Sequence, residues 1–224
     1  MASPVGRRRA ALRGTLYEYA VRLPQRSVAD RGSTVNDLLD FVFPDLVSQS
    51  EFCLRNPTDP LAQAFFSDRA VLTPTNTVVD KLNDMLLARF PEHALREYLS
   101  SDTLDSTTAD DRAIWPLDLV HTLRPDGMPL HNLRLAAGCL IVVLRNLNIE
   151  GGLCNGTRCL VMACEEHVLD VMLLTGTHQG TRTFLPRVSH TSNPDSLPIT
   201  LHRRQFPVRL AWAMTFNKAA CGHF

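Results

Sequence analysis

The pattern of apolar residues changes at Pro125-Asp126-Gly127, and this change constrains the fold more than any other feature of the sequence. Before it, apolar residues recur at the three- and four-residue spacing of helices. After it come closely spaced short runs typical of strands. The expected strands cover 133–135, 139–144, 157–162, 168–174 and 182–185. Five such strands predict a small antiparallel β-barrel, so the chain combines a helix-rich part with a strand-rich part.

The helix-rich part contains recognisable start and stop signals. Ser33-Thr34 before the first apolar positions predicts a capped helix that ends at Pro44, and Asp59-Pro60 predicts the start of a second helix. Residues 69–73 form a strand-like run, followed by a helical pattern that reaches Pro91. We also expect a surface loop at 101–112, a short helix at 115–123, and a strand or helical turn at 208–216.

Charge is unevenly distributed, although Lys+Arg and Asp+Glu both total 23. Residues 1–33 hold seven arginines and two acids (+5), residues 34–125 hold seven bases and fifteen acids (−8), and residues 126–224 hold nine bases and six acids (+3). We therefore expect a polyanion to bind the surface formed by residues 126–224 in preference to the rest of the chain. Five of its arginines have only Asp195 as a nearby acid in sequence: Arg182, Arg187, Arg203, Arg204 and Arg209. The basic segment 1–33 favours a nuclear-type patch, with a mitochondrial transit peptide as the alternative.

Two further features bear on environment and metals. No apolar run approaches the roughly 18 residues of a membrane-spanning helix, so we expect a soluble chain without a membrane partner.

The six cysteines lack a signal-peptide context, which predicts free thiols. Cys154, Cys159, Cys164 and His167 have spacings of five, five and three, unlike the Cys-x-x-Cys pairs of structural zinc sites. Buried thiols are the leading interpretation, no metal site is assigned, and zinc binding is the alternative.

The segment that is most similar to a nucleotide-binding phosphate loop does not match the motif of such a loop. Residues 151–158 place Gly156 before Thr157 and Arg158, where G-x-x-x-x-G-K followed by Ser or Thr is required. Asn155-Gly156 is also the pair that a type I′ hairpin turn favours. We therefore interpret this segment as a turn between strands.

Several longer motifs, in order, closely resemble the Pif-type (petite integration frequency) DNA helicases, and those carried by Helitron transposons are the most similar. The motifs are VLTPTN at 71–76 followed by Val79-Asp80 and Asn83, LRL at 133–135 through Gly138 to LRNL at 144–147, GLCNGTR at 152–158, LLTG at 173–176, Pro186-Arg187 and RRQFPVRLAWAMTFNKA at 203–219. The resemblance extends from about residue 34 to residue 219. It departs at the end, where a T-x-x-K-A-Q-G-like motif reads TFNKAAC at 215–221, which suggests a shifted exon, a frameshift or a decayed copy.

The resemblance implies an α/β fold. Such helicases have two RecA-like domains with ATP between them, and the second is interrupted by a small β-barrel. It implies a basic N-terminal segment (1–33), the first part of the second RecA-like domain (34–130), the barrel insert and return (131–206), and a truncated return to the RecA-like domain (207–224). ATP and magnesium are cofactors of the whole helicase, whose N-terminal RecA-like domain would be missing here, and none is expected for this chain alone. The closing arginine motif would lie beyond Phe224.

The resemblance also implies contacts with single-stranded or forked DNA. The predicted DNA-binding residues are Thr73, Thr75, Asn76, Arg145, Asn146, Arg203, Arg204, Thr215 and Asn217, and Lys218 is predicted to couple DNA to the nucleotide. Alternatives remain open at several positions: Thr75 or Asn76 could cap a helix, and Arg203-Arg204 could form a solvated charged face. No catalytic residue is assigned within this chain.

The resulting hypothesis is the C-terminal part of a Pif-type ATP-dependent DNA helicase, inactive by itself because it lacks the ATP-site motifs. DNA unwinding in repair, recombination and telomere maintenance is what the resemblance implies for the whole helicase. The alternative is a non-catalytic DNA-binding or interaction module derived from a Helitron-type helicase. A zinc-dependent nucleic-acid binder is a third possibility, which depends on the cysteines.

Overall fold

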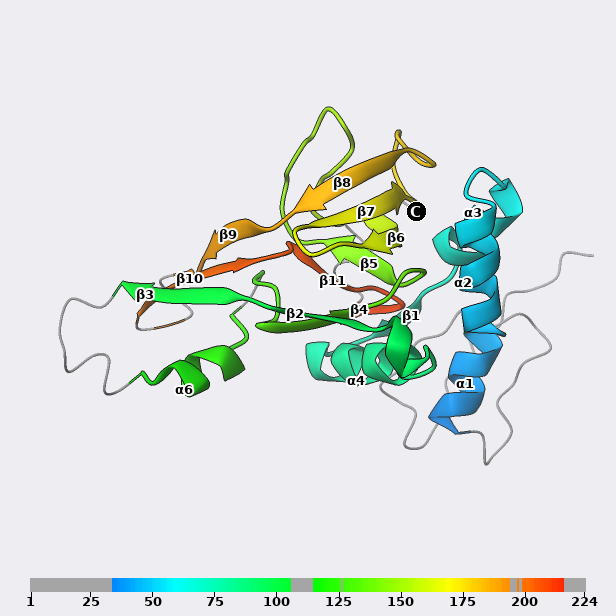
Figure 1. Ribbon diagram of the computed structural model, residues 1–224. Coiled ribbons are helices and arrows are strands. Elements are labelled where there is room, and N and C mark those ends of the chain that lie inside the picture. Colours follow the sequence, from blue (N-terminus) through cyan, green and yellow to red (C-terminus); the bar gives the residue numbers. More distant parts are fainter. Residues whose placement is uncertain (1–33, 106–114, 126, 194–196, 198, 216–224) are drawn as a thin grey trace, which may run out of the picture.

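The computed structural model describes residues 34–105, 115–125, 127–193, 197 and 199–215. Helices dominate the first part and strands the second, giving a mixed α/β fold (Figure 1). The helices are α1 (Val35–Val42), α2 (Leu46–Arg55), α3 (Pro60–Ser67), α4 (Asn76–Leu87), the 3-10 helix η1 (Glu92–Ala94) and α6 (Leu117–Thr122). None of the described helices has an apolar stretch long enough to cross a bilayer.

The first helices begin where local chemistry predicts. Thr34 and Asp37 form a reciprocal capping box at the start of α1, each side chain accepting a hydrogen bond from the other residue's backbone N–H. The Asp59 carboxylate accepts from Leu61 N–H at 2.8 Å, with Pro60 in the first position of α3. These two helices and α6 confirm their predicted positions, whereas α2 was not predicted.

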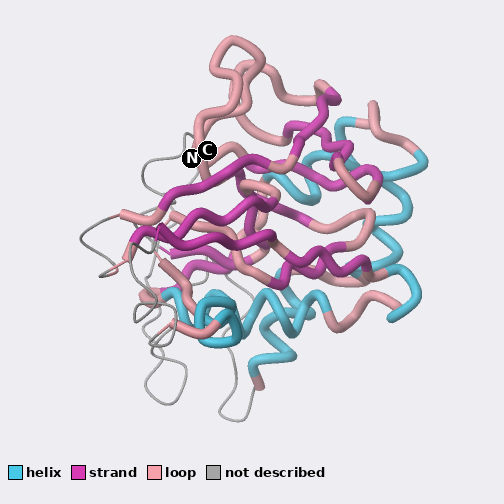
Figure 2. Tube along the Cα trace, turned by 60° about the vertical axis from the view of Figure 1, so that its left-hand side comes forward, coloured by secondary structure: helices cyan, strands magenta, loops and turns pink. Residues whose placement is uncertain are grey.

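The strands of the described residues form four sheets. A five-stranded antiparallel sheet has the order β11-β5-β6-β7-β8, a three-stranded antiparallel sheet has the order β3-β10-β9, β2 pairs antiparallel with β4, and β1 pairs parallel with β12. The strands are β1 (Val71–Thr73), β2 (Arg96–Leu99), β3 (Ser101–Asp105), β4 (Asn132–Leu135), β5 (Leu140–Val143), β6 (Arg158–Cys164), β7 (Val168–Leu173), β8 (Arg182–Pro186), β9 (Val188–Thr191), β10 (Thr200–Gln205), β11 (Val208–Leu210) and β12 (Ala213–Thr215). Figure 2 shows the helices along one side and below these strands.

The predicted closed barrel is not shown within the described residues. The five-stranded sheet ends at β11 and β8, and β4 pairs outside it, with β2. The prediction of a loop at 101–112 is wrong at residues 101–105, because these residues form β3 and pair with β10. Residues 106–114 lie outside the described residues. The final segment forms two strands, β11 and β12, rather than a helical turn.

The turn at Asn155-Gly156 also differs from the type I′ prediction. Gly156 has φ +92°, but Asp45 is the only described non-glycine residue with positive φ, so Asn155 does not adopt that conformation. A bond from Thr157 N–H to Cys154 O closes the turn at 3.0 Å. Positive φ at its third residue alone is the pattern of a type II turn.

One large apolar core joins the helices to the five-stranded sheet, and α2 contacts the segment before β5 at a glycine. Ser50 donates a hydrogen bond to Gly138 O at 3.1 Å, and a Cβ on Gly138 would lie 2.6 Å from the Ser50 Cβ. Gly138 also has φ +87°. A side chain at this position would therefore separate α2 from the sheet.

A second, smaller core lies between α6 and the β3-β10-β9 sheet. Val120, Met128 and Leu201 are its buried members. This core is where the segment before β4 attaches to the three-stranded sheet, at the left of Figure 1.

Candidate nucleic-acid interface

Four of the predicted DNA-binding residues come together at one end of the β1-β12 pair. Thr73 and Thr215 are the last residues of these parallel strands and are register partners. Thr75 precedes helix α4, and Asn76 is its first residue. Because parallel strands end at the same edge, the strand ends and the start of α4 form one polar edge, which we call the α4 edge.

The N-terminus of α4 lacks a side-chain cap. Thr75 has the extended backbone of a cap residue (φ −125°, ψ 146°), but its side chain forms no capping hydrogen bond. Thr75, Asn76 and Thr77 are all exposed. The first N–H groups of a helix have no acceptor within the helix and carry its positive dipole end, so they can bind an anion. Thr75 occupies the cap position, but the expected side-chain cap is absent.

Thr73 requires a correction. Its side chain is fully buried, and its hydroxyl accepts from Thr75 N–H at 3.2 Å and donates to Thr75 O at 3.1 Å. The hydroxyl therefore shapes the turn into α4 and is not available to DNA. Thr215 is partly exposed at the adjacent strand end.

Arg145 and Asn146 lie in the loop after β5 and are both exposed. The Asn146 side-chain oxygen accepts from Asn155 N–H at 2.8 Å, so this residue holds the two ends of the loop together. Arg145 remains at the surface, where a phosphate could reach it. The structure thus gives Asn146 a local structural role and leaves Arg145 as a candidate contact.

Arg203 is the clearest correction, because it is neither a surface contact nor part of a solvated face. Its side chain is 0% exposed and forms an ion pair of 2.7 Å with Asp102, which is also 0% exposed. The guanidinium also donates to three carbonyl oxygens, those of Val120, Leu123 and Pro129, at 3.1–3.2 Å. Arg203 therefore joins β10 to β3, α6 and the following loop.

Arg204, the next residue, is exposed because side chains alternate along β10. It lines a hollow of about 400 Å³ together with Ser101, Glu166, His167, Pro186 and Arg187. Arg204 forms no ion pair in the part of the chain that the structure describes. The carboxylate of Glu166 in the same hollow opposes phosphate binding there.

Most arginines of the predicted basic half are already engaged. Arg182 pairs with Asp170, and Arg209 pairs with Asp80 at 2.6 Å. Arg187 lies over the rings of Tyr98 and Phe206 and donates to Leu99 O at 2.8 Å. Of the five arginines named from the sequence, Arg203 and Arg209 pair with acids of the first half and Arg182 pairs with an acid of its own block. Arg204 is the one of these five that is exposed without an ion pair among the described residues.

The remaining predictions concern the two ends of the chain and the cysteines. Asn217, Lys218 and the basic segment 1–33, which carries the nuclear or mitochondrial prediction, lie outside the described residues. Cys154, Cys159, Cys164 and His167 do not come together as a metal-ligand set within the described chain. Cys159 is buried and Cys164 is partly buried, and burial raises the pKa of both thiols, to about 12 and about 11.

Sequence reasoning assigned no role to Asn83, a buried residue of α4. Its amide donates to Leu210 O at 3.1 Å and Ala213 O at 3.2 Å, and its oxygen accepts from Ala213 N–H at 2.9 Å. These bonds position β12 beside α4 and so build the α4 edge. Two signals were available: its place among the residues that carry the family resemblance, and an asparagine on the otherwise apolar face of a helix.

Comparison with known proteins identifies one segment. Residues 118–163 match the family model described as DNA helicase Pif1, 2B domain. This confirms the resemblance: the chain is similar to a Pif1-type helicase, in the C-terminal portion that holds that domain. No curated protein is similar enough to count as a match.

Solved Pif1 structures are similar at low identity. The unliganded protein from Bacteroides sp. is 22% identical, with 66% of this chain and 42% of that chain covered and a TM-score of 0.44. Pif1 from Candida albicans is 17% identical, with 78% and 44% covered and a TM-score of 0.48. Bacteroides Pif1 in complex with ADP-AlF3 and ssDNA is 19% identical, with 79% and 40% covered and a TM-score of 0.45. The chain thus spans about two fifths of each solved helicase.

Proposed function

We propose that this chain is the C-terminal part of a Pif1-type ATP-dependent DNA helicase and that it supplies contacts to single-stranded DNA. The observation that carries the proposal is the match of residues 118–163 to the Pif1 2B domain. The parallel pairing of β1 with β12, which joins residues 71–73 to 213–215, supports a RecA-like domain interrupted by the intervening strands.

The α4 edge is the proposed DNA contact. A phosphate there would accept hydrogen bonds from the first N–H groups of α4, with the hydroxyl of Thr75 and the amide of Asn76 beside it. Such contacts read no base, so binding is independent of sequence. Arg145 and Arg204 add positive charge elsewhere on the surface, while the acidic residues 34–125 limit the affinity.

ATP and magnesium belong to the proposed whole helicase rather than to this chain. Bacteroides Pif1 has been solved with ADP-AlF4, an analogue of the reacting nucleotide. The 224 residues contain no G-x-x-x-x-G-K motif, which is needed to hold and neutralise the γ-phosphate. We therefore expect no ATP hydrolysis above background from this chain alone.

The altered TFNKAAC motif at 215–221 favours a second candidate, a non-catalytic DNA-binding or interaction module derived from a Helitron-type helicase. Both candidates bind DNA, so the gene distinguishes them. An upstream reading frame encoding the phosphate loop in the same transcript supports the helicase. A transcript that starts at Met1 supports the module.

Fluorescence anisotropy with a labelled single-stranded oligonucleotide tests the shared claim of DNA binding. Non-specific binding of this kind predicts a Kd of about 10⁻⁴ to 10⁻⁶ M at physiological salt, rising steeply as salt is added. Thr75→Ala/Asn76→Ala is expected to weaken binding roughly five-fold, the equivalent of one lost hydrogen bond of about 1 kcal/mol. The matched control is Asn36→Ala, since Asn36 is an exposed asparagine in the first turn of the side-chain-capped helix α1.

Two results contradict the proposal. One is the absence of binding by the wild type at low salt. The other is an unchanged affinity in the double variant while circular dichroism shows it folded. The second result leaves DNA binding in place but removes the α4 edge from it.

A further inference from the structure

Arg124 lies beside helix α4, although it belongs to the segment that matches the 2B domain. Its Nη1 donates to Asp80 Oδ2 at 3.0 Å, and the side chain of Arg124 is 63% exposed. Asp80 follows Asn76 by four residues, so it lies on the same side of α4, about 6 Å farther along the helix axis. Arg124 is therefore held about one helical turn beyond the α4 edge.

Positive charge exceeds negative charge at Asp80, because two arginines share its carboxylate. Arg209 donates to Asp80 Oδ1 at 2.6 Å, but its side chain is only 22% exposed. Nη1 is the only guanidinium atom of Arg124 with a hydrogen-bond partner among the described residues, so other N–H donors remain available. Burial and Asp80 raise the pKa of Asp84, one turn farther along α4, whereas Arg124 and Arg134 oppose this shift. Arg124 is thus an exposed cation along this side of the helix.

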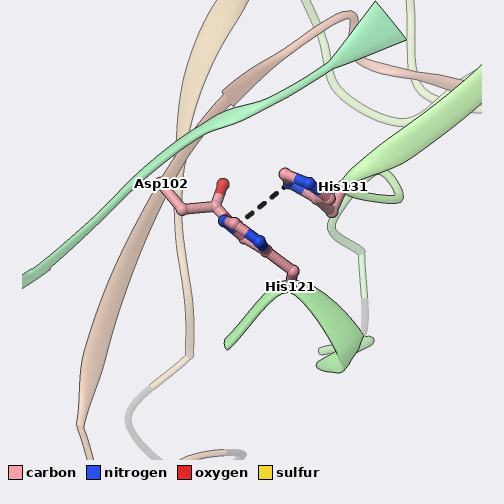
Figure 3. A group of neighbouring side chains, drawn as sticks. All are labelled: Asp102, His121 and His131. Atoms are coloured by element: carbon pink, nitrogen blue, oxygen red, sulfur yellow. Dashed lines mark ion pairs between the residues drawn. The ribbon is translucent and has the colours of Figure 1, made fainter. Parts of the chain in front are cut away.

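The backbone that carries Arg124 is fixed to the smaller core. Three residues earlier, His121 of α6 stacks on His131, with ring centroids 3.6 Å apart (Figure 3). The carbonyl of Leu123, the residue before Arg124, accepts from Arg203 Nη1 at 3.1 Å. Anchoring of this kind favours a preorganised contact, because less conformational freedom is lost when a ligand binds.

We propose, on the basis of the DNA binding proposed above, that Arg124 is a second phosphate contact for single-stranded DNA, one helical turn beyond the α4 edge. The α4 edge itself holds no charged residue, so Arg124 supplies a full positive charge that the edge lacks. A phosphate beside Arg124 competes with Asp80, and the Asp84 carboxylate limits the affinity further. The sequence did not indicate this contact, because Arg124 lies in the block of residues 34–125 with a net charge of −8.

Removing the two partners of the Asp80–Arg124 ion pair one at a time separates DNA contact from structure. Arg124→Gln should raise the Kd for a single-stranded oligonucleotide roughly ten-fold at low salt, as expected for a lost hydrogen bond to a charged group. Asp80→Asn removes the competing carboxylate and should lower the Kd by about two- to five-fold. An ion pair that only stabilises the fold would give changes of the same sign in both variants.

The salt dependence of binding gives a second readout. Each phosphate neutralised on a single strand contributes about 0.7 to the slope of log Kd against log salt concentration, so Arg124→Gln should reduce this slope by about 0.7. Arg124→Lys keeps the charge and should retain the slope. Thr75→Ala/Asn76→Ala should weaken binding without changing the slope, because it removes no charge. The matched control is Arg55→Gln, at an exposed arginine paired with Glu51 on α2, which should bind DNA like the wild type.

Circular dichroism verifies that each variant is folded, and the slope of Arg124→Gln decides alone if Asp80→Asn does not fold. Three results would overturn the proposal: an unchanged Kd and slope in Arg124→Gln, changes of the same sign in Arg124→Gln and Asp80→Asn, or an equal loss of affinity in Arg55→Gln. If Thr75→Ala/Asn76→Ala still weakens binding in these cases, the α4 edge stands without Arg124. The absence of binding by the wild type would overturn both.

Discussion

Strand β10 and the α4 edge were both predicted to contact DNA, but they are built in opposite ways. In β10, Arg203 points into the smaller core and forms a fully buried ion pair, while Arg204 points outward. At the α4 edge, Thr75 and Asn76 are exposed beside N–H groups that lack a side-chain cap. Positive charge in a sequence therefore does not by itself identify an anion site, because Arg203 is consumed by a buried ion pair, and the anion site that we propose at the α4 edge has no charged residue.

The largest expected effect separates the two arginines of β10. Arg203→Met should destabilise the chain by about 3–5 kcal/mol, because it leaves the buried Asp102 carboxylate without its partner. Arg204→Met, at the exposed neighbour, should change stability by no more than about 0.5 kcal/mol. Urea unfolding followed by circular dichroism measures both. Equal losses in the two variants would show that the inward and outward assignment is wrong.

A second prediction tests whether His190 of β9 is buried beside Arg203. His190 is 0% exposed, and neither ring nitrogen has a hydrogen-bond partner in the described structure. Burial lowers its pKa to about 4, helped by the positive charges of Arg145 and of Arg203, its register partner. The unfolded chain, with a pKa of about 6.5, binds more protons between these values. This contribution to stability is therefore complete above pH 6.5 and is lost as the pH falls toward 4.

The size of that loss is roughly 3 kcal/mol, from about 1.4 kcal/mol per pKa unit. Urea unfolding of the wild type and of His190→Leu across this pH range measures it. Since the variant keeps every other titrating group, the difference between the two curves isolates His190. Parallel curves would mean that this histidine is hydrated or hydrogen-bonded in the folded chain.

The smallest effect concerns the α4 edge. Thr75→Asp supplies the missing cap and a favourable charge, and should stabilise the chain by about 0.5–1 kcal/mol. The same carboxylate would occupy the N–H groups and repel phosphate, so DNA affinity should fall. Thermal melts and oligonucleotide anisotropy give the two readouts, with Asn36→Asp on α1 as the equal-charge control. Unchanged affinity in a more stable variant would separate the helix N-terminus from DNA binding.

Sequence patterns predicted the positions of helices and strands better than they predicted which segments contact one another. Local signals were sufficient for α1, α3, α4 and α6, because caps, prolines and apolar spacing act within a few residues. Strands β2 and β3 were missed, since their pairing with β4 and β10 depends on partners far along the chain. Strands β9 and β10 were missed as well. The five strands predicted for the barrel are present as β4 to β8, but β4 pairs with β2 and β11 lies beside β5 in its place, which the sequence pattern could not determine.

The site shows the same division. The family resemblance implied a DNA contact for each of Thr73, Thr75, Asn76 and Thr215, and the structure brings all four to one edge, which the sequence analysis did not predict. The burial of Arg203 could not be predicted, because its partner Asp102 lies 101 residues away. Strand alternation indicates that Arg203 and Arg204 face opposite sides, but it does not tell which side is the core.

Hydrogen exchange of the full chain, with and without a single-stranded oligonucleotide at low salt, tests the central claim most directly. The claim is that DNA binds at the α4 edge rather than along β10. We predict slower exchange on DNA addition at the amides of residues 76–78, whose N–H groups would donate to phosphate, and unchanged exchange at residues 200–205. Protection of 200–205 without protection of 76–78 would contradict the claim.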